Sequence, residues 1–305
     1  MSIRPVQRVI ESKPTLEGAG VKLRRAFGFG QTKEFDPFLL LDDFRNENPE
    51  DYLAGFPWHP HRGIETITYV LAGSVEHGDS LGNKGKMGAG DVQWMTAGSG
   101  ILHQEMPKGD TRGRMHGFQL WANLPASLKM TAPRYQDITS AEIPEITDDD
   151  GTHVRVICGS FWGKTGPVQG VAADPRYLDI SVAPGKRKVL PVETTQHAFA
   201  YVFQGSGTFR DASGPQAVLT EQVDSADASP SPILAVNDIG NRSLVLFDRG
   251  DEVVVQAGDE GIRFLLVSGR PIEEPVAWHG PIVMNTQAEL QQAFSELRSG
   301  KFIKQ

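Results

Sequence analysis

The pattern of hydrophobic and polar positions predicts a chain built mainly of short β-strands. "GIETITYVLAGSVEHGD" alternates apolar and polar residues and is broken at Gly73 and Gly78, and "GAGDVQWMTAGSGILHQEM" continues this style with four glycines. Alternation of period two, with turn residues about every 8 to 12 positions, is typical of sandwiches and barrels. "DPFLLLDDF" and "HGFQLWANLP" add two further strand candidates. We therefore expect an all-β fold.

Strand-like segments lie on both sides of an acidic stretch, Asp137 to Thr152, which Pro144 interrupts. We interpret this stretch as a linker and expect two domains, residues 1–140 and residues 141–305. "TITYVLAGSV" before the linker and "AFAYVFQGSGTF" after it share a Tyr-Val-x-x-Gly-Ser core. The two halves are therefore expected to be related barrels in tandem.

The C-terminal segment "NTQAELQQAFSELRSG" is the clearest helix in the sequence. Asn285 or Thr286 can cap its first turn, apolar residues recur at helical spacing, and Gly300 can end it. We expect one short helix here, at the end of the second domain.

Composition narrows the class of protein. The chain has 305 residues, of which 39% are hydrophobic and 22% charged, enough for a packed core of one large or two ordinary domains. A formal net charge of −8 argues against direct binding of nucleic acid. A single cysteine, no apolar signal segment and no run of 18 apolar residues predict a cytoplasmic protein that does not span a membrane.

Two strands carry residues of the kinds that bind metals. His59 and His61 stand two residues apart in "FPWHPHRGIETITYV", and His103 and Glu105 do so in "SGILHQEMP". Side chains alternate between the faces of a strand, so each pair shares a face, and Glu65 shares that of the first pair if the strand is regular. Three imidazoles and one carboxylate suit a divalent transition metal, non-haem Fe(II) above all. The alternative is that these are ordinary strand-edge histidines, and strand parity alone allows either carboxylate.

Several longer motifs of the sequence resemble those of a known family. "FPWHPHRGIETITYVLAGSVEHGD", "GKMGAGDVQWMTAGSGILHQEMP" and "HGFQLWANLP" closely resemble pirins, which belong to the cupin superfamily, and "DPFLLLDDF" and "HGPIVMNT" extend the resemblance over nearly the whole chain. It implies two cupin (jelly-roll) β-barrels facing each other, with one metal in the N-terminal barrel. The family's ligands carry over onto His59, His61, His103 and Glu105, and Glu65 is then expected to act only through the ligands.

The remaining candidates are weaker. The second half has no His-x-His pair, so we expect no metal there. Gln119 and His116 are candidates for hydrogen bonds that orient a ligand, and Arg62 for a surface or interdomain ion pair. Asp42 or Asp43, at the end of an apolar strand, can bond a backbone or ligand group. Three apolar residues close to the ligands in sequence line a substrate pocket or belong to the core: Phe56, Trp94 and Met95.

Two functions follow from the resemblance. The first is a dioxygenase that opens the ring of a flavonol such as quercetin, with Fe(II) or, alternatively, nickel, cobalt, manganese, copper or zinc as its metal. The substrate 3-hydroxyl would bind the metal, Glu105 would accept its proton, and dioxygen would be the second substrate. The second is an iron-dependent, redox-sensitive regulator that binds a transcription factor or a metabolic enzyme. Both need the metal, so the ligand motif does not separate them.

Overall fold

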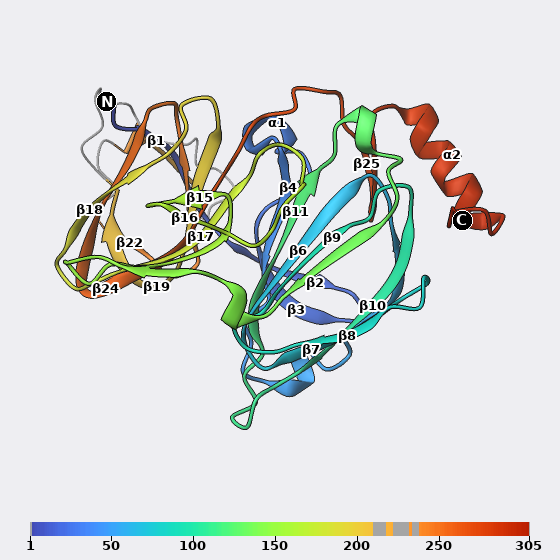
Figure 1. Ribbon diagram of the computed structural model, residues 1–305, viewed down its shortest axis with the longest axis horizontal. Coiled ribbons are helices and arrows are strands. Elements are labelled where there is room, and N and C mark those ends of the chain that lie inside the picture. The colour runs from blue at the N-terminus through green and yellow to red at the C-terminus, as the bar shows by residue number, and fades with distance from the viewer. Residues whose placement is uncertain (1, 210–217, 222–231, 234–237, 305) are drawn as a thin grey trace. The chain divides into compact units, whose positions relative to one another are not determined.

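The computed structural model of the chain consists mainly of β-strands, which confirms the all-β prediction (Figure 1). It describes residues 2–209, 218–221, 232–233 and 238–304. The chain divides into two compact units. The N-unit comprises Lys13–Glu142 and Ile272–Gln305, and the C-unit comprises Met1–Ser12 and Ile143–Pro271.

The N-unit contains two antiparallel sheets and a strand pair. Its strands are β2 (Lys13–Glu17), β3 (Val21–Phe27), β4 (Phe38–Asp43), β5 (Phe56–His61), β6 (Ile64–Ala72), β7 (Ser74–Asp79), β8 (Lys84–Met87), β9 (Val92–Thr96), β10 (Ile101–Lys108), β11 (His116–Asn123), β12 (Arg134–Ile138), β25 (Ala277–His279) and β26 (Ile282–Met284). Its helices are α1 (Thr32–Phe35), α2 (Gln287–Arg298) and the short 3-10 turns η1 (Pro49–Asp51), η2 (Ala126–Leu128) and η3 (Ser140–Glu142). One sheet has the order β12-β9-β6-β11-β4-β3-β2, the other β5-β10-β7-β8, and β25 pairs with β26.

The C-unit contains one large sheet and a two-stranded ribbon. Its strands are β1 (Val6–Glu11), β13 (Glu145–Thr147), β14 (His153–Cys158), β15 (Ser160–Phe161), β16 (Lys164–Thr165), β17 (Arg176–Val182), β18 (Arg187–Pro191), β19 (His197–Thr208), β20 (Val218–Glu221), β21 (Pro232–Ile233), β22 (Ile239–Gly240), β23 (Ser243–Phe247) and β24 (Glu252–Gly269). The sheet runs β13-β14-β17-β24-β19-β23-β1-β20-β21, with β18 on β24 and β22 on β19. Apolar side chains fill its core, among them Val156, Leu178, Phe264 and Leu266.

Each end of the chain joins the unit formed mostly by the other half. The crossing between the units lies within the expected linker. The contiguous division into residues 1–140 and 141–305 differs from the structure, because residues 1–12 belong to the C-unit and residues 272–305 to the N-unit. In Figure 1 the dark blue β1 accordingly belongs with yellow and orange strands, and the red α2 with blue to green ones. β1 is placed by its pairing with β23, and the C-terminal residues by an apolar cluster that includes Leu102.

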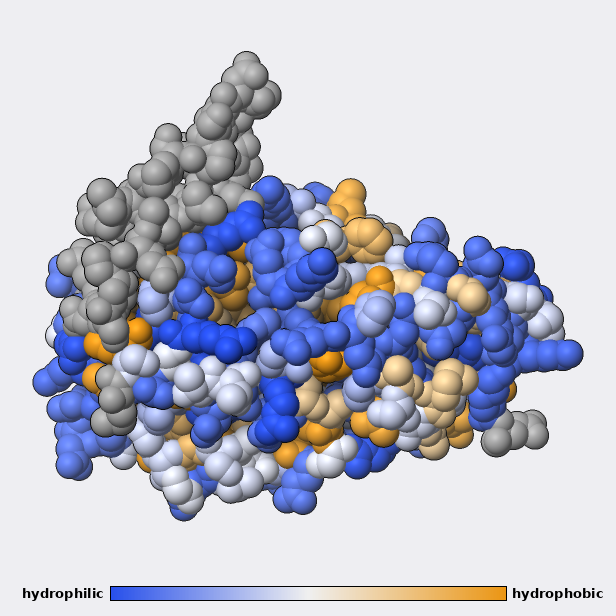
Figure 2. All heavy atoms as spheres, turned by 90° about the horizontal axis from the view of Figure 1, so that it is seen from above, coloured by the Kyte–Doolittle hydropathy of each residue, from blue (hydrophilic) through white to orange (hydrophobic). Residues whose placement is uncertain are grey.

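Local sequence explains most element boundaries. The chain turns at Gly73, where φ is +81°, but it runs through Gly78 without a break inside β7. The C-terminal helix is confirmed: the Thr286 side chain accepts from the Glu289 backbone N–H, the Glu289 side chain bonds back to the cap, and Gly300 follows with φ +71°. In the described part of the chain, no helix has the length and apolar character needed to cross a membrane. Hydrophilic residues cover most of the face drawn in Figure 2.

Candidate metal centre

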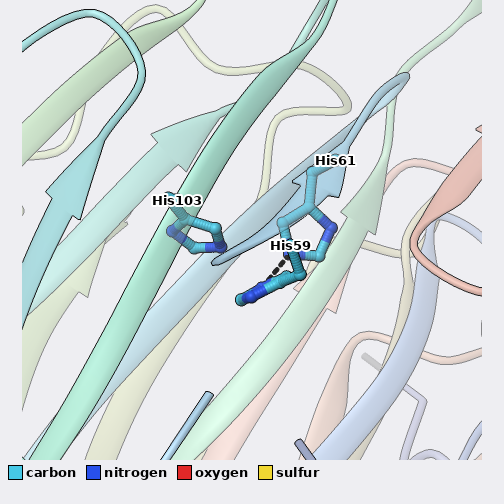
Figure 3. Close-up of side chains that lie close together, drawn as sticks. All are labelled: His59, His61 and His103. Atoms are coloured by element: carbon cyan, nitrogen blue, oxygen red, sulfur yellow. Dashed lines mark hydrogen bonds between the residues drawn. The ribbon is translucent and has the colours of Figure 1, made fainter. Parts of the chain in front are cut away.

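Three histidines of the N-unit point toward one another from two paired strands. β5 and β10 run antiparallel with His59 opposite His103. Along β10 every second residue from Ile101 to Pro107 is buried, which turns His103 and Glu105 inward as their spacing predicts. The candidate ligand atoms of His59, His61 and His103 all lie within 4.8 Å of one another (Figure 3).

Backbone carbonyls fix the orientation of two of these rings. Nδ1 of His59 lies 2.8 Å from the Pro57 carbonyl oxygen, and Nδ1 of His61 lies 3.2 Å from the Pro281 carbonyl oxygen. A carbonyl only accepts, so each Nδ1 must carry the hydrogen and each Nε2 of the neutral ring is left with a lone pair. Those two Nε2 atoms are 3.1 Å apart. A cation between them would satisfy both, and a metal-binding histidine commonly donates its other N–H in this way.

His103 gives the strongest sign that this group of side chains can hold a metal. Its side chain is 1% exposed, and neither ring nitrogen has a hydrogen-bond partner within the described residues. Buried polar atoms are normally paired, so an unpaired imidazole at this point needs an explanation. Burial holds the pKa of His61 and of His103 well below the ordinary value, and the neighbouring histidines lower both further. Neutral imidazoles are the form that binds metals, so the donor set fits a divalent transition metal.

Glu105 is inward-facing but engaged with other partners. Its carboxylate accepts hydrogen bonds from the Thr68 hydroxyl at 3.2 Å and from the Gln119 amide at 3.3 and 3.4 Å. It lies outside the tight group of three histidines. Gln119 therefore holds a candidate ligand, as the sequence suggested, while the role of Glu105 as a fourth ligand stays a prediction.

Glu65 does not share the face of the histidines. The strand ends at His61, Gly63 takes a φ of +77°, and the chain continues as β6 in the other sheet. Glu65 accepts a hydrogen bond of 2.7 Å from Thr96 on β9. Within β6 it has the opposite parity to Thr68, which bonds Glu105. The expectation from a regular strand was wrong because the chain changes sheets at this glycine.

Arg62 was expected in a surface or interdomain ion pair, and this was wrong. Its side chain is 2% exposed, and its guanidinium donates to Glu296 at 2.8 Å and to the Phe302 carbonyl at 2.7 Å. The guanidinium carbon lies 4.2 Å from the centre of the Phe302 ring. All three residues belong to the N-unit. The C-terminal helix is thus tied to the residue that follows His61.

A cleft of about 520 Å³ opens beside the histidines, a volume typical of small-molecule sites. His59 and His61 form part of its wall. The Trp121 ring meets the His61 ring edge-on at 5.0 Å, and Trp278 lies 6.1 Å beyond Trp121. The other aromatic side chains of the wall are Phe29, Phe56 and Trp58, and its charged side chains are Glu17, Arg25 and Asp42.

The structure places the weaker sequence candidates in different surroundings. Phe56 lines the cleft, whereas Met95 belongs to an apolar core cluster and Trp94 is 1% exposed. His116 lies 3.6 Å from Glu47 through its Nε2, at the start of β11. Both strand-end aspartates bond arginines: Asp42 accepts from Arg25 at 2.8 and 2.7 Å, and Asp43 accepts from Arg45.

Sequence reasoning missed the contribution of the C-terminal segment. Pro281 accepts from His61, and Trp278 lines the cleft, although both come more than 200 residues after His61. "VAWHGPIVM" gives no local sign of this return. Over the described residues of the C-unit, no group of three metal-binding side chains occurs.

Two family models match this chain. The family model described as Pirin matches residues 20–122, and the model of the Pirin C-terminal cupin domain matches residues 177–303. A pirin-like protein of Caulobacter vibrioides is 44% identical over 303 residues, which cover 99% of this chain and 100% of that protein. Pirin of Homo sapiens is 38% identical over 302 residues, 98% of this chain and 94% of that protein.

A solved structure is similar over the same length. The crystal structure of quercetin 2,3-dioxygenase from Acinetobacter baumannii has a TM-score of 0.84 and 30% sequence identity, with 99% of each chain covered. Together with the two family models, this confirms the expected tandem of two cupin domains.

Proposed function

This chain belongs to the pirin family of two-domain cupins, and from that premise we propose that it is a metal-dependent dioxygenase that opens the ring of a flavonol. The observation that carries the proposal is the group of His59, His61 and His103 at the wall of an aromatic cleft. We assign these three histidines and Glu105 as ligands of one Fe(II). When bound, iron would supply the centre at which an enolic hydroxyl and dioxygen react.

The cleft suits a flat aromatic substrate. Trp121 and Trp278 offer ring faces and edges for the fused rings of a flavonol, since aromatic rings gain from offset or edge-to-face contact. Arg25 and Asp42 add charged groups to the same wall, and these can bond the phenolic hydroxyls. A flavonol is similarly apolar in its ring faces and polar at its rim.

We assign Glu105 as the general base that accepts the proton of the substrate hydroxyl. It is 4% exposed, and the Thr68 hydroxyl and Gln119 amide orient its carboxylate. A positioned general base contributes about 10²- to 10⁴-fold to the rate. The same two neighbours would hold the carboxyl group after it takes the proton.

The test is anaerobic reconstitution with Fe(II), followed by addition of air and measurement of flavonol loss and carbon monoxide release. Glu105→Gln should lose at least about 100-fold in turnover per bound metal. Glu65→Gln is the matched control, because Glu65 is also buried, at 2% exposed, but bonds Thr96. A dead Glu65→Gln beside an active Glu105→Gln would overturn the assignment. Iron binding without any flavonol turnover would favour the regulatory alternative.

A further inference from the structure

A second, smaller cavity lies in the N-unit behind Glu105. Its volume is about 20 Å³, more than the roughly 10–15 Å³ that one water molecule needs. Most of its wall is apolar, including Val21, Phe44, Val75 and Met115, each no more than 9% exposed. These four residues belong to one core cluster.

The polar side chains of the wall already make hydrogen bonds within the protein. The Thr68 hydroxyl donates to Glu105, and the Gln119 amide donates to both Glu105 and the Thr68 oxygen. The Tyr52 hydroxyl donates to the Gly113 carbonyl. A buried water needs about two to four polar partners, whereas a dry apolar cavity accepts apolar atoms such as xenon. The walls therefore favour a small apolar guest over water.

The cavity shares part of its wall with the cleft. Phe56 and Gln119 line both spaces, and Glu105 lines the small one. Phe56 and Gln119 therefore form a boundary between the two spaces. Motion of these two side chains would connect the cavity with the cleft.

We propose that this cavity is a holding site for one dioxygen molecule beside Glu105. The proposal rests on the proposed oxygenase function for its purpose, but the site itself does not depend on the metal. Dioxygen is small and apolar, needs no hydrogen-bond partner, and is the second substrate of the proposed reaction. Storage here raises the chance that dioxygen is present when the aromatic substrate fills the cleft.

The first test uses metal-free protein and no substrate. Crystals pressurised with xenon should show a xenon atom among Val21, Val75 and Met115. In solution, dissolved dioxygen should enhance the relaxation of the Met115 methyl group more than that of Met95, which lies in another core cluster. An ordered water in the cavity, or no xenon there, would overturn the proposal.

The second test fills the cavity. Val75→Leu adds one methylene to the wall, and Val92→Leu adds the same group at a buried site of β9 outside it. Val75→Leu should lose the xenon and raise KM for dioxygen several-fold with KM for the flavonol unchanged, while Val92→Leu should do neither. Val21→Leu serves as a second filling variant if Val75→Leu does not fold.

The outcomes separate the two proposals. Xenon and dioxygen in the cavity of a protein without flavonol turnover would retain the gas site and reject the proposed function. Loss of xenon in Val75→Leu with an unchanged KM for dioxygen would reject the holding role in an active enzyme.

Discussion

Replacing His103 with leucine should stabilise the metal-free protein while it abolishes metal binding. Both ring nitrogens of His103 are buried without a hydrogen-bond partner in the described structure. An unsatisfied buried polar group costs about 1–3 kcal/mol, and leucine removes that cost while it fills a similar volume. We therefore expect the free energy of unfolding of metal-free His103→Leu to rise by about 1 kcal/mol or more by this reasoning.

With metal bound, wild type should be more stable to unfolding than His103→Leu. A ligand present at 100 times its Kd stabilises the folded state by about 2.7 kcal/mol. Wild type should gain this on addition of Fe(II) under anaerobic conditions, and His103→Leu should not. Urea unfolding followed by tryptophan fluorescence is a suitable assay, because four of the five tryptophans lie in the N-unit: Trp58, Trp94, Trp121 and Trp278.

His77→Leu is the matched control. His77 is 6% exposed, but its Nε2 lies 2.9 Å from the Gln93 amide and its ring stacks on Tyr135 at 5.7 Å. Only one of its two ring nitrogens lacks a partner, and the same substitution there also loses a hydrogen bond worth about 1 kcal/mol, so metal-free His77→Leu should be less stable than metal-free His103→Leu. If His103→Leu is no more stable than His77→Leu without metal, His103 has partners of its own and the reasoning fails.

Three further predictions concern the candidate metal site and the ion pair between Arg62 and Glu296. Purified protein should hold at most about one equivalent of tightly bound metal, measured by elemental analysis, and two equivalents would contradict a single site. Arg62→Met should lower the free energy of unfolding in urea titrations by about 1–3 kcal/mol, since it leaves the buried Phe302 carbonyl without its donor; an unchanged midpoint would show that Arg62 does not hold the C-terminal segment in place. Hydrogen bonding to Lys304 above all lowers the pKa of Glu296 to about 2 from 4.5. The Glu296 carboxylate therefore stabilises the folded protein above pH 4.5, and this contribution is lost as pH falls toward 2. In Glu296→Gln this loss should be absent from the dependence of unfolding free energy on pH.

Much of the candidate site was predictable because strand geometry is local. The alternation along β10 was sufficient to place His103 and Glu105 on one buried face. The pair His59 and His61 followed from the same rule within β5. Strand alternation does not tell which strand pairs with which. The convergence of the two pairs was therefore expected only from the resemblance to pirins, and the β5–β10 register accounts for it.

The wrong expectation for Glu65 has its physical origin at Gly63. A positive φ ends the local parity of β5, so Glu65 leaves the face that its spacing predicts. A Cβ at Gly63 would lie 1.9 Å from the Val283 carbonyl oxygen, which no side chain tolerates. The glycine is therefore required by a strand that arrives 220 residues later, and nothing in the sequence around residue 63 indicates that contact.

The contacts around Gly63 also explain why the C-terminal segment belongs to the N-unit. The Lys129 ammonium donates to the carbonyls of Gly63 and Val283 and to the Asn123 side chain, at 2.9, 3.1 and 2.8 Å. Val283 in turn donates its backbone N–H to Arg62. The backbone after His61 is thus held by a buried cation and by β26, while Pro281 fixes the ring of His61. A candidate ligand held from both its backbone and its ring keeps its position without metal, so the C-terminal segment supports the candidate metal site although it supplies none of the proposed ligands.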